Sequence, residues 1–174
     1  AMSAYEGFRM ESDVKAGGLN QADLTSDDMY YTKAEMKSMI QNYRKLGLDI
    51  IPEFDTPAHS LSFTKVRPDL RFGTTGRQND HFNLNTKYDE SLAFVESIWD
   101  EYIKGDDPVF DRDTIVNIGT DEYDGQYTEQ FRKFTDDLLA YIQDNGNTVR
   151  LWGSLTARSG STSVRSEGVQ MNIW

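Results

Sequence analysis

The sequence contains no cysteine, only two histidines and only four prolines among its 174 residues. The absence of cysteine excludes disulfide bonds, zinc sites built on thiolates and a thiol nucleophile. Lysine and arginine (18) are outnumbered by aspartate and glutamate (29), which gives a formal net charge of −11. Nucleic acids and anionic membranes need a basic patch, so we expect neither as a partner. The charge fits a neutral or cationic ligand, although acidic surfaces also keep proteins soluble.

The chain also has no apolar run near the roughly 20 residues that a membrane helix requires, so no membrane insertion is expected. No secretory signal peptide is visible, and the opening Ala1-Met2 is interpreted as a cloning scar. A hydrophobic fraction of 37% and an aromatic fraction of 12% are sufficient for a buried core. The length corresponds to one domain.

Residues 1–29 are polar and rich in glycine and aspartate, and they are interpreted as a loop with a short strand around Phe8–Met10. Thr32 and Glu35 form a capping-box pattern at the start of a helix that Gly47 closes. Four strands and two further helices are then expected, with loops over 60–88 and 153–168. The strands are 48–51, 114–118, 148–152 and 169–174, and the helices are 89–103 and 128–144.

Alternation of strands and helices predicts a parallel sheet with right-handed crossovers. No glycine-rich phosphate loop follows a strand, so the signature of a nucleotide-binding doubly wound fold is missing. Polar residues follow the strand ends, as they do on the catalytic face of a (β/α)8 barrel. A complete barrel needs roughly 250 residues. The predicted fold is therefore α/β, either an open sheet or part of a TIM barrel.

Asp121 and Glu122 follow a predicted strand directly. Beyond the strand the backbone can turn, so both carboxylates can reach one pocket. Crowded carboxylates titrate at different pH values, which leaves one as an acid and the other as an electrostatic stabiliser. The dipeptide is common, however, and a solvated loop is the alternative reading.

The segment 52–59 places Asp55 and His59 at another strand end. His59 is a candidate for orienting an acid or shuttling a proton, or else a structural hydrogen-bonding residue. Asp55, His59, Asp121 and Glu122 also carry metal-ligand atoms, but two histidines without tight ligand spacing disfavour a metal site.

Trp152 and Trp174 each end a predicted strand, where they are either core residues or aromatic walls for a sugar ring. Trp99 lies in the apolar stripe of a helix and is expected in the core. His81 lies in a polar loop, and no role is predicted for it.

Two motifs together resemble glycoside hydrolase family 20, the β-N-acetylhexosaminidases. Residues 52–59 (PEFDTPAH) are similar to the family's Pro-Glu-Ile/Phe-Asp-x-Pro-Gly-His, and residues 117–122 (NIGTDE) to its His-x-Gly-Gly-Asp-Glu. The resemblance covers residues 30–174, including 82–85 (FNLN) and the two strand-end tryptophans in family order. It implies that 30–174 hold about strands 3 to 6 of a TIM barrel and that 1–29 form an excursion after strand 2.

The resemblance implies a retaining hydrolase for β-linked N-acetylglucosamine, N-acetylgalactosamine or a disaccharide containing the former. Glu122 would be the general acid and then the base, and Asp121 would hold the substrate's acetamido group, whose carbonyl oxygen is the nucleophile. His59 would tune Glu122, and Trp152 and Trp174 would line the acetamido pocket.

Asp55 and Tyr123 are expected to support this site, and no metal or organic cofactor is implied. The partner would be an oligosaccharide or glycoconjugate. Absence of cysteine and an acidic charge would suit a bacterial secreted or cell-surface glycosidase.

Three residues depart from the family pattern. Ala58 replaces glycine, Asn117 replaces histidine and Thr120 replaces the second glycine. A threonine at a position with positive φ would be strained. These changes favour a subgroup with different outer subsites, such as one that releases lacto-N-biose.

The family's first-strand arginine and its relay aspartate have no counterpart here, and Arg9 corresponds to neither. Strands 7 and 8 would follow Trp174. We therefore expect a truncated barrel that self-associates through unpaired strand edges and has little activity alone. Two alternatives remain: a non-catalytic carbohydrate-binding barrel, and a barrel glycosidase with Glu53 or Asp55 as a second carboxylate opposite Glu122.

Overall fold

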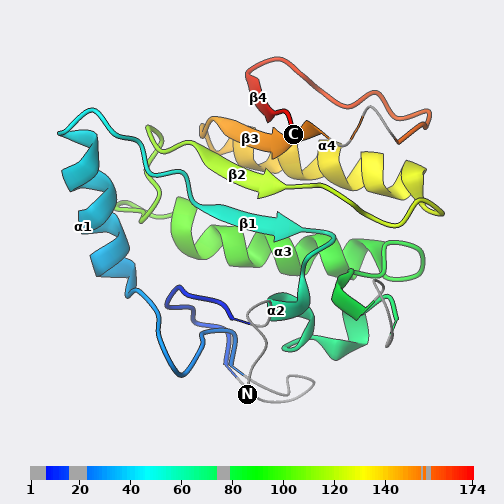
Figure 1. Cartoon of the computed structure of the whole chain (residues 1–174), viewed down its shortest axis with the longest axis horizontal. Coiled ribbons are helices and arrows are strands. Elements are labelled where there is room, and N and C mark those ends of the chain that lie inside the picture. The colour runs from blue at the N-terminus through cyan, green and yellow to red at the C-terminus, as the bar shows by residue number, and fades with distance from the viewer. Residues whose placement is uncertain (1–6, 16–22, 74–78, 154, 156–157) are drawn as a thin grey trace.

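The structure is a computed structural model that describes residues 7–15, 23–73, 79–153, 155 and 158–174. Four parallel strands form one sheet in the order β1-β2-β3-β4, and helices lie in the connections from β1 to β2 and from β2 to β3 (Figure 1). The fold is a partial (β/α)8 barrel. In chain order the elements are α1 (Lys33–Arg44), β1 (Glu53–Thr56), α2 (Leu61–Thr64), the 3-10 helix η2 (Pro68–Leu70), α3 (Tyr88–Ile103), β2 (Val116–Gly119), α4 (Thr128–Asp144), β3 (Val149–Trp152) and β4 (Val169–Asn172).

The predicted capping box begins α1. The Thr32 hydroxyl accepts a hydrogen bond from the Glu35 backbone N–H, and the Glu35 carboxylate accepts one from the Thr32 backbone N–H at 2.8 Å. These bonds satisfy two donors that a helix N-terminus leaves free. The helix ends at Arg44, and Gly47 follows in the left-handed conformation with φ +78°.

The strand predicted over 48–51 was wrong in position, because β1 begins at Glu53. Pairing with β2 starts there, with Glu53 opposite Asn117, and Leu48 is 56% exposed. The position of the strand is therefore decided by pairing with β2, although the composition of 48–51 favours a strand.

Two other local predictions also need correction. The loop expected over 60–88 contains the short helices α2 and η2. The strand expected around Phe8–Met10 is reduced to a single bridge between Met10 and Tyr31. Ala1-Met2 and the Gly17-Gly18 pair lie outside the described residues.

Helices α3 and α4 cover one face of the sheet (Figure 1). Phe54 of β1 packs there against Trp99 and Tyr102, with ring centroids 4.4 and 5.2 Å apart, and Trp99 is fully buried as predicted. The apolar stripe of α4 is also buried throughout, namely Phe131, Phe134, Leu138, Leu139 and Ile142. These contacts make the helix-covered face the hydrophobic core.

The opposite face of the sheet is polar. Across the four strands, Glu53 lies opposite Asn117, Asn117 opposite Arg150, and Arg150 opposite Gln170. The Arg150 guanidinium donates to Gln170 Oε1 at 2.7 and 3.1 Å. In a closed barrel this face lines the interior. Among the described residues, no helix is long and apolar enough to cross a membrane.

Candidate active site

The candidate residues meet at one edge of the sheet. Because all four strands are parallel, their carboxyl ends point the same way. Asp55 and His59 come from β1 and the turn after it, and Asp121 and Glu122 follow β2. Trp152 ends β3 and Trp174 follows β4. A cavity of about 260 Å³ is lined by Asp121, Glu122 and the two tryptophans.

His59 lies between the two acidic residues. Its Nε2 is 3.2 Å from Glu122 Oε2 and 3.6 Å from Asp121 Oδ1. The Asp121 side chain is 15% exposed and the Glu122 side chain 45% exposed. One imidazole nitrogen therefore faces a shielded carboxylate and an accessible one, which suits a group that orients an acid.

Left-handed backbone conformations produce this arrangement. His59, Thr120 and Glu122 have φ values of +52°, +64° and +47°. Such conformations cost on the order of 1–3 kcal/mol for residues other than glycine, and they concentrate at functional sites. The strain predicted for Thr120 is present, and its N–H donates to the Thr56 carbonyl oxygen at 3.1 Å.

Gly119 allows β1 and β2 to approach closely. It has φ +72°, and a Cβ atom there would overlap the Asp55 carboxylate. Burial raises the pKa of the Asp55 carboxyl to about 9, with further contributions from the charges of Asp121 and Glu53 and a hydrogen bond with Asp121. The raised pKa favours the neutral carboxylic acid form of Asp55 beside Asp121.

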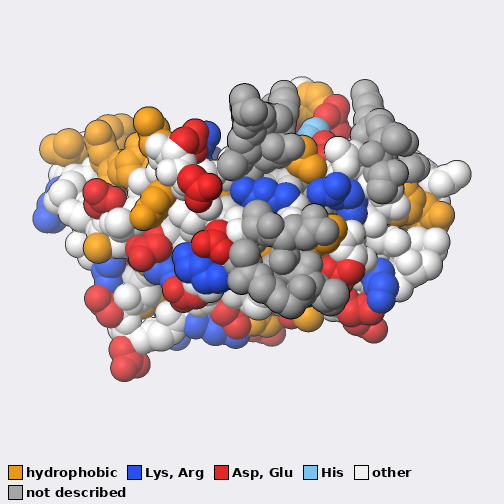
Figure 2. Space-filling view, turned by 90° about the horizontal axis from the view of Figure 1, so that it is seen from below, with side chains coloured by type: hydrophobic (Ala, Val, Ile, Leu, Met, Phe, Trp, Pro, Cys, Tyr) orange, Lys and Arg blue, Asp and Glu red, His pale blue; other side chains and the backbone are white. Residues whose placement is uncertain are grey.

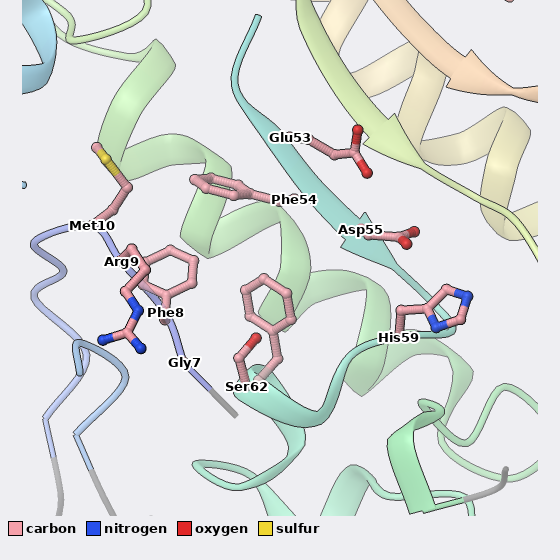
Figure 3. A pocket seen from close by; sticks show the side chains of 10 residues that line it. Gly7, Phe8, Arg9, Met10, Glu53, Phe54, Asp55, His59 and Ser62 are labelled. Atoms are coloured by element: carbon pink, nitrogen blue, oxygen red, sulfur yellow. The ribbon is translucent and has the colours of Figure 1, made fainter. Parts of the chain in front are cut away.

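A second cavity of about 330 Å³ lies along β1, between Glu53, Asp55 and His59 on one side and residues 7–10 on the other (Figure 3). Arg9 lines it, but its guanidinium pairs with Asp28 and donates to the Met29 carbonyl oxygen at 3.0 Å. This cation therefore has its own partners away from the site carboxylates.

Asp80 and His81 were missed as site residues. Asp80 Oδ2 lies 3.8 Å from His59 Nδ1, and its Oδ1 lies 2.6 Å from His81 Nδ1. His81 is 3% exposed and stacks on Tyr123 with ring centroids 5.0 Å apart. Both residues lie within the loop predicted over 60–88, so their proximity to His59 could not be predicted from the sequence.

Tyr123 lies beneath the site rather than in the cavity. It is fully buried, and its hydroxyl donates to the Phe82 carbonyl oxygen at 2.8 Å. Its ring stacks on Phe131 of α4. Its support for the site is therefore structural, through His81 and the segment around Phe82.

Three residues offer ligand atoms to a metal ion. One atom each of Asp55, His59 and Asp121 lies within 4.8 Å of the others. Asp55 would first have to lose the proton that its raised pKa retains.

Comparison with known proteins assigns the family. Residues 2–174 match the glycosyl hydrolase family 20 catalytic domain, so the chain belongs to this family. It is 22% identical over 167 residues to the lacto-N-biosidase of Bifidobacterium bifidum, covering 83% of this chain and 14% of that protein. It is 31% identical over 113 residues to human β-hexosaminidase subunit beta, covering 61% of this chain and 19% of that protein. The chain thus spans less than a fifth of either relative.

Solved structures show the same fold. The chitobiase of Flavobacterium johnsoniae aligns with a TM-score of 0.71 and 18% identity, covering 96% of this chain and 27% of that one. The β-N-acetylhexosaminidase of Bacteroides fragilis aligns with a TM-score of 0.68 and 17% identity, covering 98% and 37%. These alignments support the partial barrel.

Proposed function

We propose that this chain carries the acid–base centre of a retaining glycoside hydrolase for β-linked N-acetylhexosamines. The observation that carries the proposal is the contact of His59 with Asp121 and Glu122, which line one cavity together with Trp152 and Trp174. Family membership gives the reaction class, hydrolysis of a glycosidic bond. The human relative's name, β-hexosaminidase, supports an aminosugar as substrate.

Substrate-assisted catalysis fits the division between the two carboxylates. Glu122, the more exposed of the two, would protonate the glycosidic oxygen as the bond to C1 breaks. The acetamido carbonyl oxygen would form the new bond to C1, giving an oxazolinium intermediate. Glu122 would then take a proton from water as the water oxygen attacks C1, which restores the acetamido group.

Asp121 would hold the acetamido N–H. It lines the cavity together with Glu122 and the two tryptophans, and its side chain is 15% exposed. A carboxylate oxygen at the cavity wall can accept a hydrogen bond from a substrate N–H. The negative charge would also stabilise the positive charge of the oxazolinium ring.

The two-carboxylate alternative is less well supported. Asp55 retains its proton near pH 7 and would be a poor nucleophile. Glu53 uses both carboxylate oxygens, one to accept from Asn117 Nδ2 at 2.6 Å and the other from Trp152 Nε1 at 3.1 Å. A carboxylate whose two oxygens both accept hydrogen bonds from protein donors is a weaker nucleophile for attack on C1.

The test compares two chromogenic substrates in a form of the protein with all eight barrel strands. We expect hydrolysis of p-nitrophenyl N-acetyl-β-D-glucosaminide and no hydrolysis of the matching β-D-glucoside, which lacks the acetamido nucleophile. Equal turnover of both would support a direct carboxylate nucleophile. Binding of N-acetylglucosamine with no turnover of the N-acetylglucosaminide or the lacto-N-bioside would support a non-catalytic sugar-binding barrel.

Release of a disaccharide is the second substrate proposal, supported by the similarity to a lacto-N-biosidase and by Asn117 and Thr120 in place of the usual family residues. Faster cleavage of p-nitrophenyl lacto-N-bioside than of the monosaccharide substrate is the expected result for such an enzyme. The reverse preference would assign release of a single N-acetylhexosamine.

We also propose that the 174-residue chain alone self-associates and has little activity. Each of β1 and β4 pairs with only one strand among the described residues, and Ile173 and Trp174 are 89% and 71% exposed. Figure 2 shows further hydrophobic side chains gathered at the α1 end, where Leu46 is 74% exposed. Unpaired edges and apolar patches promote association. A monodisperse monomer in light scattering would contradict self-association. Rapid turnover by this chain alone would contradict the low activity.

A further inference from the structure

Glu53 connects two walls of the candidate site. It lies on the polar face of β1, where its Oε2 accepts from Asn117 Nδ2 of β2 at 2.6 Å. Its Oε1 accepts from Trp152 Nε1 of β3 at 3.1 Å. One carboxylate thus bridges three strands, and each oxygen has a different donor.

Trp152 needs such a partner to keep a fixed orientation. It is half-buried at the end of β3, and its indole forms part of the cavity that Asp121 and Glu122 line. Indole has a single polar atom, the Nε1–H donor. A hydrogen bond to a carboxylate is stronger than one to a neutral acceptor, so it favours one ring orientation over others.

Asn117 presents a hydrogen-bond donor to Glu53, so the facing atom of Glu53 must be an acceptor. Asn117 is 3% exposed, and its Oδ1 accepts from the Gly119 backbone N–H at 3.0 Å. This bond fixes the amide orientation, which leaves Nδ2 as the donor that faces Glu53. Gly119 is the last residue of β2, two residues before Asp121, so this chain of hydrogen bonds ends at the start of the turn that carries the acidic pair.

We propose that Glu53 is a positioning residue that fixes the Trp152 indole as a wall of the substrate cavity and couples it, through Asn117, to the turn of the acidic pair. Glu53 acts through these neighbours and touches no reacting atom. The consequence for catalysis rests on the proposed function, whereas the consequence for the Trp152 orientation does not.

The hydrogen-bond pattern gives a variant and its matched rescue. In Glu53→Gln one side-chain oxygen becomes an NH2 donor, which must face either Trp152 Nε1 or Asn117 Nδ2, both of them donors. In Glu53→Gln with Asn117→Asp the carboxylate and the amide exchange places. The glutamine at position 53 then accepts from Trp152 and donates to the carboxylate at position 117. That carboxylate still accepts from the Gly119 N–H, and the net charge is unchanged.

The first readout is the indole N–H of Trp152 in this chain, measured by ¹H–¹⁵N NMR and assigned with Trp152→Phe. We expect hydrogen exchange at this N–H at least fivefold faster in Glu53→Gln, whose neutral amide is a weaker acceptor or faces the indole with its NH2 group. Exchange should be largely restored in the double variant, where the amide oxygen is held toward the indole. Unchanged exchange in Glu53→Gln would overturn the proposal. Where Glu53→Gln fails to fold, the double variant decides, since exchange at least fivefold faster than in the wild type would equally overturn it.

The second readout is activity, in a form with all eight barrel strands. We expect Glu53→Gln to raise KM for p-nitrophenyl N-acetyl-β-D-glucosaminide roughly tenfold with a smaller effect on kcat, and the double variant to recover the wild-type KM. Equal KM values for Glu53→Gln and the wild type would overturn the catalytic consequence. A wild type that hydrolyses no aminosugar would refute the proposed function, while the indole exchange still tests the role of Glu53.

Discussion

His59 Nε2 lies 3.2 Å from Glu122 Oε2, and both residues have left-handed backbone conformations at the ends of adjacent strands. Neither conformation is favourable in isolation. The paired strands β1 and β2 hold the two turns next to each other, so that the two side chains come into contact. The local strain is thus offset by the sheet that brings the residues together.

His59→Ala should lower kcat more than it raises KM. The substitution removes the group that orients Glu122 and leaves the tryptophan walls in place. Positioned proton-transfer groups contribute about 10²–10⁴-fold, so a loss of about 10²-fold in kcat is expected. Steady-state kinetics across pH in an eight-stranded form measures this. An unchanged kcat and pH profile would exclude His59 from the relay.

Asp55→Asn should remove a pH dependence of stability. The pKa of Asp55 is raised from 3.8 to about 9, so the folded state keeps a proton that the unfolded state releases. The contribution of Asp55 to the free energy of unfolding should be largest below pH 4 and should fall by about 1 kcal/mol per pH unit as the pH rises toward 9. Urea unfolding of the wild type and the variant at pH 5 to 8 tests this slope. Parallel curves for the two proteins would contradict the assigned protonation.

Asp111→Asn should show the opposite dependence. Arg44 donates to both Asp111 oxygens at 2.8 Å, and this pair lowers the pKa of Asp111 to about 2. The stabilisation is present above the ordinary pKa of 3.8 and is lost as the pH falls through about 2. Because the pair is partly exposed, the variant should lose only about 1 kcal/mol at pH 7. A deficit that stays the same down to pH 2 would exclude the ion pair as its cause.

Gly119→Ala and Thr120→Gly should have opposite effects on stability. A Cβ at Gly119 would overlap the Asp55 carboxylate at a position with φ +72°, so a loss of about 3 kcal/mol or more is expected. Glycine at Thr120 relieves a positive φ and should raise the free energy of unfolding by about 1 kcal/mol. Thermal unfolding of both variants checks the two signs. A destabilised Thr120→Gly would mean that the Thr120 hydroxyl, which donates to the Gly119 carbonyl oxygen, outweighs the strain.

Much of the fold could be predicted from local patterns, because the apolar periodicity and the capping residues of a helix lie within its own stretch of sequence. Helix α4 begins and ends at the residues predicted, and the capping box of Thr32 and Glu35 is formed. The strand before Pro52 was misplaced because its composition favours a strand, while the pairing partner that decides its position comes much later in the chain.

The site followed only in part from the sequence. Asp121, Glu122, His59 and the two tryptophans lie together because parallel strands share a carboxyl edge. The contact of Asp80 with His59 and the bridge of Glu53 to Trp152 depend on side chains from distant segments, for which no spacing rule exists. The resemblance to the family identified the residues, and tertiary packing determined their partners.

Glu122→Gln tests most directly whether Glu122 is the general acid. In an eight-stranded form, we expect turnover of p-nitrophenyl N-acetyl-β-D-glucosaminide by the wild type and a loss of at least 10²-fold in kcat in the variant, since glutamine has no acidic proton to donate. The variant should still bind the substrate, because the cavity walls are unchanged. Equal kcat values for the two proteins would contradict Glu122 as the general acid and, with it, the mechanism proposed for this site.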